Sequence, residues 1–256
     1  MAYLHALREF TARLLGQLPA SCGLCLGSAR GGRLCGYCHL AVTHSMVQST
    51  PRCTVCQLVL NGAGMCPDCV QHTPAFDRVI AAFDYAPPGD LLIHRLKIQR
   101  QFISAGMLAG LLADAVLAST PALHTAAVLV PVPASRAALL RRGFNPAAEL
   151  ARSLASKLRR PCRPELLLRA REGVKQAQLS RVERARSVQA LYSCPPHVHG
   201  LHIAVVDDVL TTGSTLHSIA KTFKAGGAAS VWGLVLARTP YPPDGLVAAP
   251  RPGPRD

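Results

Sequence analysis

Apolar positions between residues 76 and 238 follow two kinds of pattern. Short, nearly continuous apolar runs are typical of strands that are buried on both faces of a sheet. These runs are FDRVIAAFDYA (76–86), AAVLVPVP (126–133), LHIAVVDDVL (201–210) and SVWGLVLAR (230–238). The longer segments between them carry apolar residues at the spacing of a helix face. These segments are residues 87–119, 145–160 and 214–228.

The ends of the helical segments carry recognisable signals. The sequence PPG (87–89) opens the first segment and precedes its apolar part. In the second segment, Asn145 followed by Pro146 predicts an N-cap and a first helical position. Gly226 and Gly227 are expected to end the third. Strands that alternate with helices predict an α/β domain, with a parallel sheet and helices on both faces. Ligands of such sheets bind at the carboxyl ends of the strands.

The 256 residues allow one α/β domain, expected at residues 76–239, and a smaller module before it. Residues 1–20 are predicted to form an amphipathic helix, since charged residues interrupt the leucines and leave no apolar core for a signal peptide. Residues 240–256 are rich in Pro and Gly and are expected to be disordered. No apolar run reaches the roughly 18–20 residues of a membrane span. We therefore expect a cytoplasmic protein.

The formal charge of +14 is concentrated in one part of the chain. Between Arg136 and Arg186 lie twelve arginines and two lysines against four glutamates, a local excess of ten positive charges. Such a surface attracts phosphates, nucleic acid or acidic ligands, and a solvated face without a partner is the alternative. Aromatic residues make up only 5% of the chain, which argues against a platform for base stacking.

Eight of the ten cysteines lie between residues 22 and 69 and form an internal repeat. The second set is the first set displaced by 31 residues at every position. Each C-x2-C pair can direct two thiolates at one tetrahedral ion, so the pattern predicts a double zinc ribbon at residues 21–72. Its ligands are Cys22, Cys25, Cys35 and Cys38 for one ion, and Cys53, Cys56, Cys66 and Cys69 for the other.

Two alternatives to this zinc assignment remain open. The cysteines of the two sets can be paired in an interleaved rather than a sequential way. A disulfide framework would require an oxidising compartment, which no export signal supports. A ribbon of this size buries little apolar surface, so we expect the metal to supply much of its folding energy. Cys162 and Cys194 stand apart and are interpreted as ordinary thiols.

The stretch IAVVDDVLTTGST (203–215) is the strongest candidate for a ligand site. Asp207 and Asp208 are expected at the carboxyl end of a central strand, followed by a loop of small residues that leads into a helix N-terminus. Orphan N–H groups and the helix dipole favour a phosphate there, and Gly213 lets the backbone approach it. Carboxylates suit sugar hydroxyls or a magnesium ion. The sequence lacks the G-x4-G-K-[ST] pattern of a Walker loop. A ribose 5-phosphate is therefore the predicted ligand class, and a simple polar turn is the alternative.

The stretch resembles the phosphoribosyl pyrophosphate (PRPP) motif of type I phosphoribosyltransferases. The chain from roughly residue 15 to 238 resembles the ComF family of competence proteins, which join a double zinc ribbon to such a domain. The resemblance rests on the eight cysteines and on HRLK (94–97), VPVP (130–133), RRGFNPAAELA (141–151), QAQLSRVERARSV (176–188) and VVDDVLTTGSTL (205–216). It implies a type I phosphoribosyltransferase-like parallel sheet with helices on both faces, preceded by a small double zinc-ribbon module.

The resemblance also implies roles for individual residues. Asp207 and Asp208 would hold the ribose hydroxyls, with magnesium accompanying PRPP. The 5-phosphate would lie on the loop formed by Thr211, Thr212, Gly213, Ser214 and Thr215. The loop that contains Pro131 and Val132 would meet the pyrophosphate. Further polar contacts would come from Lys97, Arg142 and Gln176.

Some positions depart from the family pattern. The family usually has Gln at the position of Pro146 and Asn at that of Ser187. After Lys97 it usually has an aromatic residue and a nearby Gly, where this chain has IQR at 98–100. These departures put in doubt the part of the site that would recognise a second substrate. Lys97 can accordingly be a ligand contact or a solvated helix residue, and Gln176 and Arg181 can belong to an exposed helix.

Three functions are compatible with this sequence. The resemblance favours an accessory protein of DNA uptake and natural transformation that binds PRPP and handles incoming single-stranded DNA. Its other partners would be a DNA-uptake helicase or channel proteins. The second function is an active phosphoribosyltransferase with an unknown acceptor, whose catalytic residues the sequence does not identify. The third is a zinc-ribbon interaction module with a non-catalytic PRPP-like fold.

Overall fold

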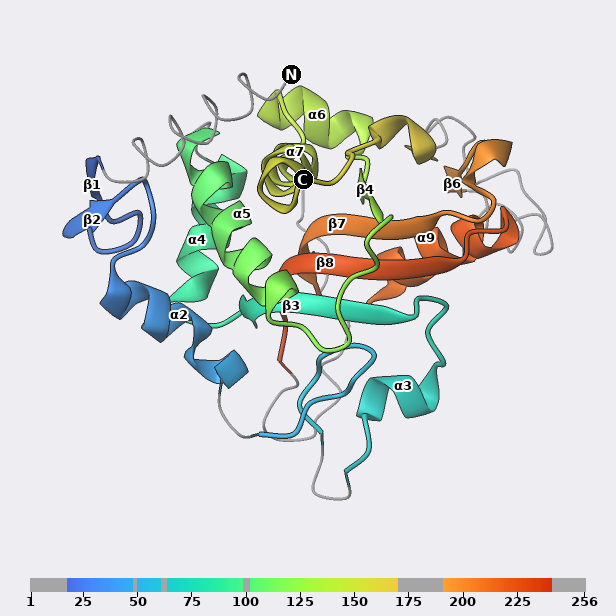
Figure 1. The fold of residues 1–256 in the computed structure, drawn as a ribbon, viewed down its shortest axis with the longest axis horizontal. Coiled ribbons are helices and arrows are strands. Elements are labelled where there is room, and N and C mark those ends of the chain that lie inside the picture. Colours follow the sequence, from blue (N-terminus) through green and yellow to red (C-terminus); the bar gives the residue numbers. More distant parts are fainter. Residues whose placement is uncertain (1–17, 48–49, 61–63, 99–101, 170–190, 241–256) are drawn as a thin grey trace.

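The computed structural model describes residues 18–47, 50–60, 64–98, 102–169 and 191–240. Its centre is a sheet of four parallel strands in the order β3-β8-β7-β4 (Figure 1). The strands are β3 (Arg78–Asp84), β4 (Val128–Pro131), β7 (His202–Leu210) and β8 (Ser230–Arg238). Each lies within one of the apolar runs, so the predicted parallel sheet is confirmed.

The strands are buried on both faces because successive side chains point to opposite sides of a strand. In β7, Ala204 and Val206 belong to one hydrophobic core, and Ile203 and Val205 belong to the other. The helices of the sheet domain in the first core are α4 (Gly89–Ile98), α5 (Phe102–Leu117) and α7 (Pro146–Leu158), and α2 (Gly36–Val47) adds Val42 to the same core. The second core is covered by α9 (Ser214–Ala225). The helices on both faces are therefore confirmed as well.

Two helical predictions need correction. The segment 87–119 forms α4 and α5 rather than one helix. A single helix of that length would span about 50 Å, whereas both shorter helices bury leucines in the same core, as Leu92 and Leu108 show. The second correction is α6 (Arg136–Arg142), which the sequence did not predict. It has no buried residue, so it leaves no apolar stripe in the sequence.

The predicted caps of two helices are confirmed. The Oδ1 of Asn145 accepts a hydrogen bond from the backbone N of Ala147 at 3.1 Å, and Pro146 is the first residue of α7. Gly226 is the C-cap of α9. In the described part of the chain, no helix has the length and apolar character that crossing a bilayer requires.

The cysteine repeat forms a small module that shares the cores of the sheet domain. Its elements are β1 (Pro19–Ser21), β2 (Ser28–Arg30), α2 (Gly36–Val47) and α3 (Pro67–Gln71). Cys22 and Cys38 of the first set belong to the core of α4, α5 and α7. Cys53 and Cys56 of the second set belong to the core of α9. Each cysteine set therefore packs against a different core, and α3 lies below the β3 edge in Figure 1. A further antiparallel pair joins β5 (Leu168–Arg169) to β6 (Tyr192–Ser193).

Candidate functional site

The two adjacent carboxylates lie near the carboxyl end of β7, between β8 and β4. Because side chains alternate along a strand, Asp207 and Asp208 leave it in opposite directions. Asp207 lines a cavity of about 40 Å³ together with Ser214 and Thr215 at the start of α9. Asp208 forms an ion pair with Lys97, with 3.0 Å between Oδ2 and Nζ. The end of β7 thus offers one carboxylate to the loop side and one to the α4 side.

The two carboxylates differ in their electrostatic surroundings. Burial, and then the charge of Asp208, raise the pKa of Asp207 from 3.8 to about 7. The ammonium of Lys97 opposes this shift only weakly. The backbone N of Asp208 donates to Oδ1 of Asp207 at 2.9 Å, which also favours the charged form. Near neutral pH, Asp207 is therefore poised between its protonated and ionised states, and a bound cation would favour the ionised state.

The loop after β7 has the features of an anion site. Gly213 has φ of 77° and is the N-cap of α9, a conformation that residues with a side chain seldom adopt. The hydroxyls beside it are exposed to solvent, and Thr212 Oγ1 lies 3.1 Å from Ser214 Oγ. No acidic residue occupies the first turn of α9. The positive end of the helix dipole is therefore free of a competing carboxylate.

The end of β4 lies beside this loop. Pro131 is the last residue of β4, and the backbone N of Val132 donates to Val206 O of β7 at 2.9 Å. Val132 also lines the same cavity as Asp207. Its carbonyl accepts a hydrogen bond from Asn145 Nδ2 at 2.9 Å, so the cap of α7 also holds the loop after β4. The structure therefore brings Val132 to the Asp207 side of the sheet edge.

The remaining candidate residues differ in whether they lie at the carboxylates. Lys97 reaches the site from the last turn of α4. Arg142 ends α6, and no hydrogen bond or ion pair joins it to Asp207 or Asp208 within the described ranges. Gln176 and Arg181 lie outside the described residues. Three further polar contacts were expected from the sequence, namely Lys97, Arg142 and Gln176. Among the described residues, only Lys97 of these three contacts a carboxylate of the pair.

The eight clustered cysteines form two groups in the sequential order. Cys22, Cys25, Cys35 and Cys38 make one group, and Cys53, Cys56, Cys66 and Cys69 make the other. Within each group all Sγ atoms lie within 4.8 Å of one another. This result resolves the pairing that the spacing left open. All ten cysteines lie in the described ranges and none forms a disulfide, so the disulfide framework is not adopted.

The repeat in the sequence is also a repeat in the backbone. Leu26 and Gln57 follow the second cysteine of each set, and both have φ of 63°. In each turn the N–H of this residue donates to the carbonyl of the first cysteine, at 3.0 Å for Leu26 and 2.9 Å for Gln57. Two copies of the same tight turn therefore present the first two thiols of each group.

The thiol groups fit a tetrahedral ion. Thiolates held about 2.3 Å from such an ion lie about 3.8 Å apart, and the Sγ atoms of Cys25 and Cys35 are 3.8 Å apart. Burial would raise the pKa of Cys22, but backbone N–H groups, that of Cys35 included, donate to it and hold the pKa at about 6. Burial and the neighbouring sulfurs raise the pKa of Cys38 to about 12. Four such thiols cannot ionise together without a cation, which is the chemistry of a metal site.

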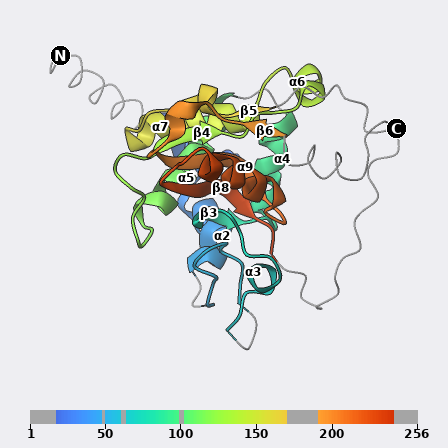
Figure 2. The same cartoon turned by 90° about the vertical axis from the view of Figure 1, so that its right-hand side faces the viewer.

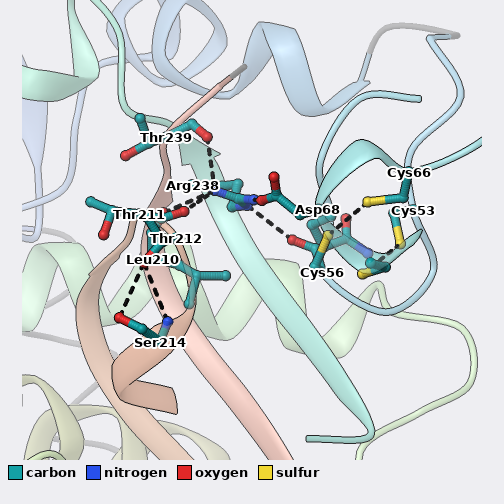
Figure 3. A network of polar contacts seen from close by, with 12 residues as sticks. Cys53, Cys56, Cys66, Asp68, Leu210, Thr211, Thr212, Ser214, Arg238 and Thr239 are labelled. Atoms are coloured by element: carbon teal, nitrogen blue, oxygen red, sulfur yellow. Dashed lines mark hydrogen bonds and ion pairs between the residues drawn. The ribbon is translucent and has the colours of Figure 1, made fainter. Parts of the chain in front are cut away.

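One residue at the site gave no signal in the sequence. Arg238 ends β8, where it resembles a charged residue that flanks an apolar strand. Its side chain is buried, and its Nη1 donates to the carbonyl oxygens of Leu210 and Thr211, at the start of the loop (Figure 3). Its partners are distant in sequence, so only the tertiary structure reveals this contact.

Comparison with known proteins agrees with this geometry. Residues 137–243 match the model of the family described as phosphoribosyl transferase domain. The chain is 34% identical over 221 residues to the DNA utilization protein YhgH of Escherichia coli, covering 85% of this chain and 90% of that protein. It is 32% identical to competence protein F of Haemophilus influenzae, with 80% and 90% of the two chains covered.

This chain belongs to the ComF family. The ComF resemblance seen in the motifs is thereby confirmed, and it extends to both parts of the chain, because the aligned relatives cover 85% of it. Among solved structures, an allosteric regulatory enzyme of purine biosynthesis is similar at 18% identity and a TM-score of 0.41, over 56% of this ComF chain and 30% of that protein.

Proposed function

We propose that this ComF protein binds PRPP together with magnesium at the carboxyl edge of its sheet, and that it acts in DNA uptake by handling incoming single-stranded DNA in the cytoplasm. The observation that carries the proposal is the pairing of a left-handed Gly213 at the N-terminus of α9 with the carboxylates at the end of β7. The names of the relatives, which refer to DNA utilization and competence, support the cellular role.

Each part of the site has a physical task in this proposal. The 5-phosphate accepts hydrogen bonds from the loop 211–215, at the positive end of α9. Asp207 and Asp208 accept hydrogen bonds from the ribose hydroxyls or ligate the magnesium, which neutralises charge on the pyrophosphate. Lys97, which contacts Asp208 at 3.0 Å, supplies a cation on the α4 side. Val132 places the backbone that follows β4 beside the ligand.

Helix α6 is the best-placed surface for DNA. It begins five residues after β4 ends, so it lies near the same edge of the sheet as the proposed PRPP site. It carries Arg136, Arg141 and Arg142, and none of its residues is buried. Figure 2 shows it at the periphery of the fold. Phosphates of a single strand would meet these guanidinium groups, and the exposed Leu140 offers an apolar contact beside them.

Zinc is the ion that we assign to both cysteine groups, as a structural metal. Four thiolates in a tetrahedral arrangement are typical of zinc, and iron–sulfur chemistry is the main alternative. Both groups pack into the cores of the sheet domain, so each ion would stabilise the fold beyond its own turn. The third function considered from the sequence, an interaction module, would use this same zinc-bearing surface.

Titration calorimetry tests the PRPP site. PRPP with magnesium should bind the wild-type protein, and Asp207→Asn combined with Asp208→Asn should weaken binding about a hundredfold or more. Two charged hydrogen bonds contribute roughly 1.5–3 kcal/mol each, and every 1.4 kcal/mol is about tenfold in affinity. Asp114→Asn is the matched control, because this exposed carboxylate on α5 lies outside the cavity. Equal affinities for the double variant and the control would refute the site.

Catalysis is the second candidate, and the position of Lys97 favours it. In a phosphoribosyl transfer, pyrophosphate departs from C1 of the ribose, and cations must stabilise its developing charge. Lys97 Nζ lies 3.0 Å from Asp208 and can serve this purpose. Pyrophosphate release from PRPP over a library of bases and amines would establish transfer. PRPP binding without any release would favour a binding role.

A further inference from the structure

Arg238 is a buried cation that holds the start of the proposed phosphate loop. Only 2% of the residue is exposed. Its Nη1 donates to the carbonyl of Leu210 at 3.3 Å, to that of Thr211, and to that of Thr239 at 2.9 Å. Thr239 N in turn donates to Leu210 O at 2.9 Å. These contacts fix the peptide groups through which the chain leaves β7 for the loop.

The other side of the same guanidinium reaches the second cysteine group. Its Nε donates to the carbonyl of Cys56 at 3.1 Å, and its Nη2 lies 2.9 Å from Oδ2 of Asp68. Cys56 is one of the four thiol residues of that group, and Asp68 stands between two others, Cys66 and Cys69. Figure 3 shows the guanidinium between the cysteine group and the loop.

We propose that Arg238 is a positioning residue that couples PRPP affinity to metal binding at the second cysteine group. A metal bound there fixes the turn of Cys56 and the helix start that carries Asp68. These two acceptors orient the planar guanidinium, whose donors lie in a rigid fork. The guanidinium then holds the carbonyls of Leu210 and Thr211, and with them the start of the loop. The inference rests on the proposed PRPP function.

The first cysteine group provides an internal comparison. It packs in the other core, and a hydrogen bond from Arg95 Nη1 of α4 to the carbonyl of Gly23 links it to the sheet domain. That link reaches α4 and not the phosphate loop. Metal loss from the first group should therefore disturb the loop much less than metal loss from the second.

The direct test acts on Asp68, because replacing the buried Arg238 risks the fold. The Asp68 side chain is 36% exposed, so the protein should tolerate its replacement. Asp68→Ala removes the counter-charge of Arg238, and Asp68→Asn retains an oxygen acceptor. Asp84→Asn is the matched control, since it weakens the two hydrogen bonds from Arg52 that also hold this cysteine group against β3. Asp84 pairs with Arg238 through the backbone of the sheet, but its carboxylate is not among the partners of the Arg238 guanidinium in the described part of the chain.

Two readouts are needed for each variant, after metal analysis confirms an unchanged metal content. Hydrogen exchange of the amides in residues 211–217 should be faster in Asp68→Ala than in the wild type. The dissociation constant of PRPP should rise at least about fivefold, the lower end of common coupling effects. Asp68→Asn should recover much of both losses, and Asp84→Asn should match the wild type. Equal losses in Asp84→Asn would show that general docking of the module, not Arg238, is responsible.

Coupling is reciprocal, so PRPP should also slow metal loss. With magnesium and PRPP present, a chelating dye should extract one of the two metal ions at least about fivefold more slowly, and Asp68→Ala should lose this protection. If PRPP binds but neither affinity, loop exchange nor metal release changes in Asp68→Ala, the inference is wrong and the proposed function stands. If the wild type binds no PRPP, the proposed function fails, and unchanged loop exchange in Asp68→Ala would then overturn the positioning role too.

Discussion

Protonation of Asp207 should control PRPP binding near neutral pH. Burial and the charge of Asp208 raise the pKa of Asp207 to about 7. Magnesium and ribose hydroxyls both require the ionised carboxylate, because a protonated one has lost acceptor capacity and charge. The affinity for magnesium and PRPP should therefore fall as the pH drops through about 7, well above the range in which ordinary aspartates titrate.

The size of this effect follows from the population of the ionised form. With a pKa of about 7, about one tenth of the Asp207 side chains are ionised at about pH 6, so the apparent affinity should be about tenfold below its value at about pH 8. Phosphate groups of PRPP also titrate, with a pKa of about 6. Asp207→Asn provides the correction, because its remaining pH dependence comes from the ligand and the other residues.

Titration calorimetry from about pH 5.5 to 8.5 would measure both proteins. We expect the wild type to bind more tightly than Asp207→Asn above about pH 7, and the two affinities to converge as the pH falls. Parallel pH profiles for the two proteins would refute the assigned pKa or the role of Asp207 in the site.

The same pKa predicts the opposite trend for the stability of the ligand-free protein. The folded state holds a proton up to about pH 7, whereas the unfolded chain releases it near 3.8. Protonated Asp207 therefore stabilises the folded state fully below about pH 4, and this stabilisation is lost as the pH rises through about 7. Asp207→Asn should raise that free energy at about pH 8 by about 1–3 kcal/mol, and by less near pH 5. Calorimetric melting at both pH values would detect it.

Three further predictions concern the metal, the loop and the basic helix. Purified protein should hold two zinc ions by elemental analysis. Cys56→Ser should lower the melting temperature of the whole chain in a single unfolding transition, because Cys56 shares a core with the sheet. A separate unfolding transition of the cysteine module would contradict this. Gly213→Val should weaken PRPP binding, because a side chain in the left-handed conformation costs about 1–2 kcal/mol. A clash is not the cause, since the added Cβ would make only an ordinary 3.7 Å contact with Phe76. Gly213→Asn should lose less affinity, because Asn tolerates this conformation. Arg141→Ala with Arg142→Ala should reduce the salt dependence of single-strand binding by about 0.7 in logarithmic slope per lost phosphate contact, and an unchanged slope would favour a solvated face.

Features that depend on neighbours in sequence were accessible before the structure. The cap of α7 depends on Asn145 and Pro146, which are adjacent, and the metal groups depend on short cysteine spacings. The position of the β7 carboxylates could also be predicted locally, because an apolar run predicts the strand and the strand places Asp207 and Asp208 near its end. In each case the geometry arises within one turn or one strand, so a single local segment contains the necessary information.

Helix α6 shows why other features were missed. A helix is recognised in a sequence through the residues that it buries, and Arg136–Arg142 buries none. The prediction of one helix over residues 87–119 was wrong for another reason. The apolar spacing continues through both helices, so it does not reveal that α4 and α5 are separate and pack against the same core.

The sequence by itself determined the four strands of the parallel sheet, helices α7 and α9, and the two cysteine groups, because local hydrogen bonding, burial periodicity and short spacings specify each of them. Only the tertiary structure decided which core each cysteine group joins and which side chains meet at the carboxylates. Lys97 reaches Asp208 from α4, and Arg238 reaches Asp68 across 170 positions of sequence. Such contacts depend on the order of strands in the sheet, since that order brings distant segments to the same edge and lets a buried charge find its partners there.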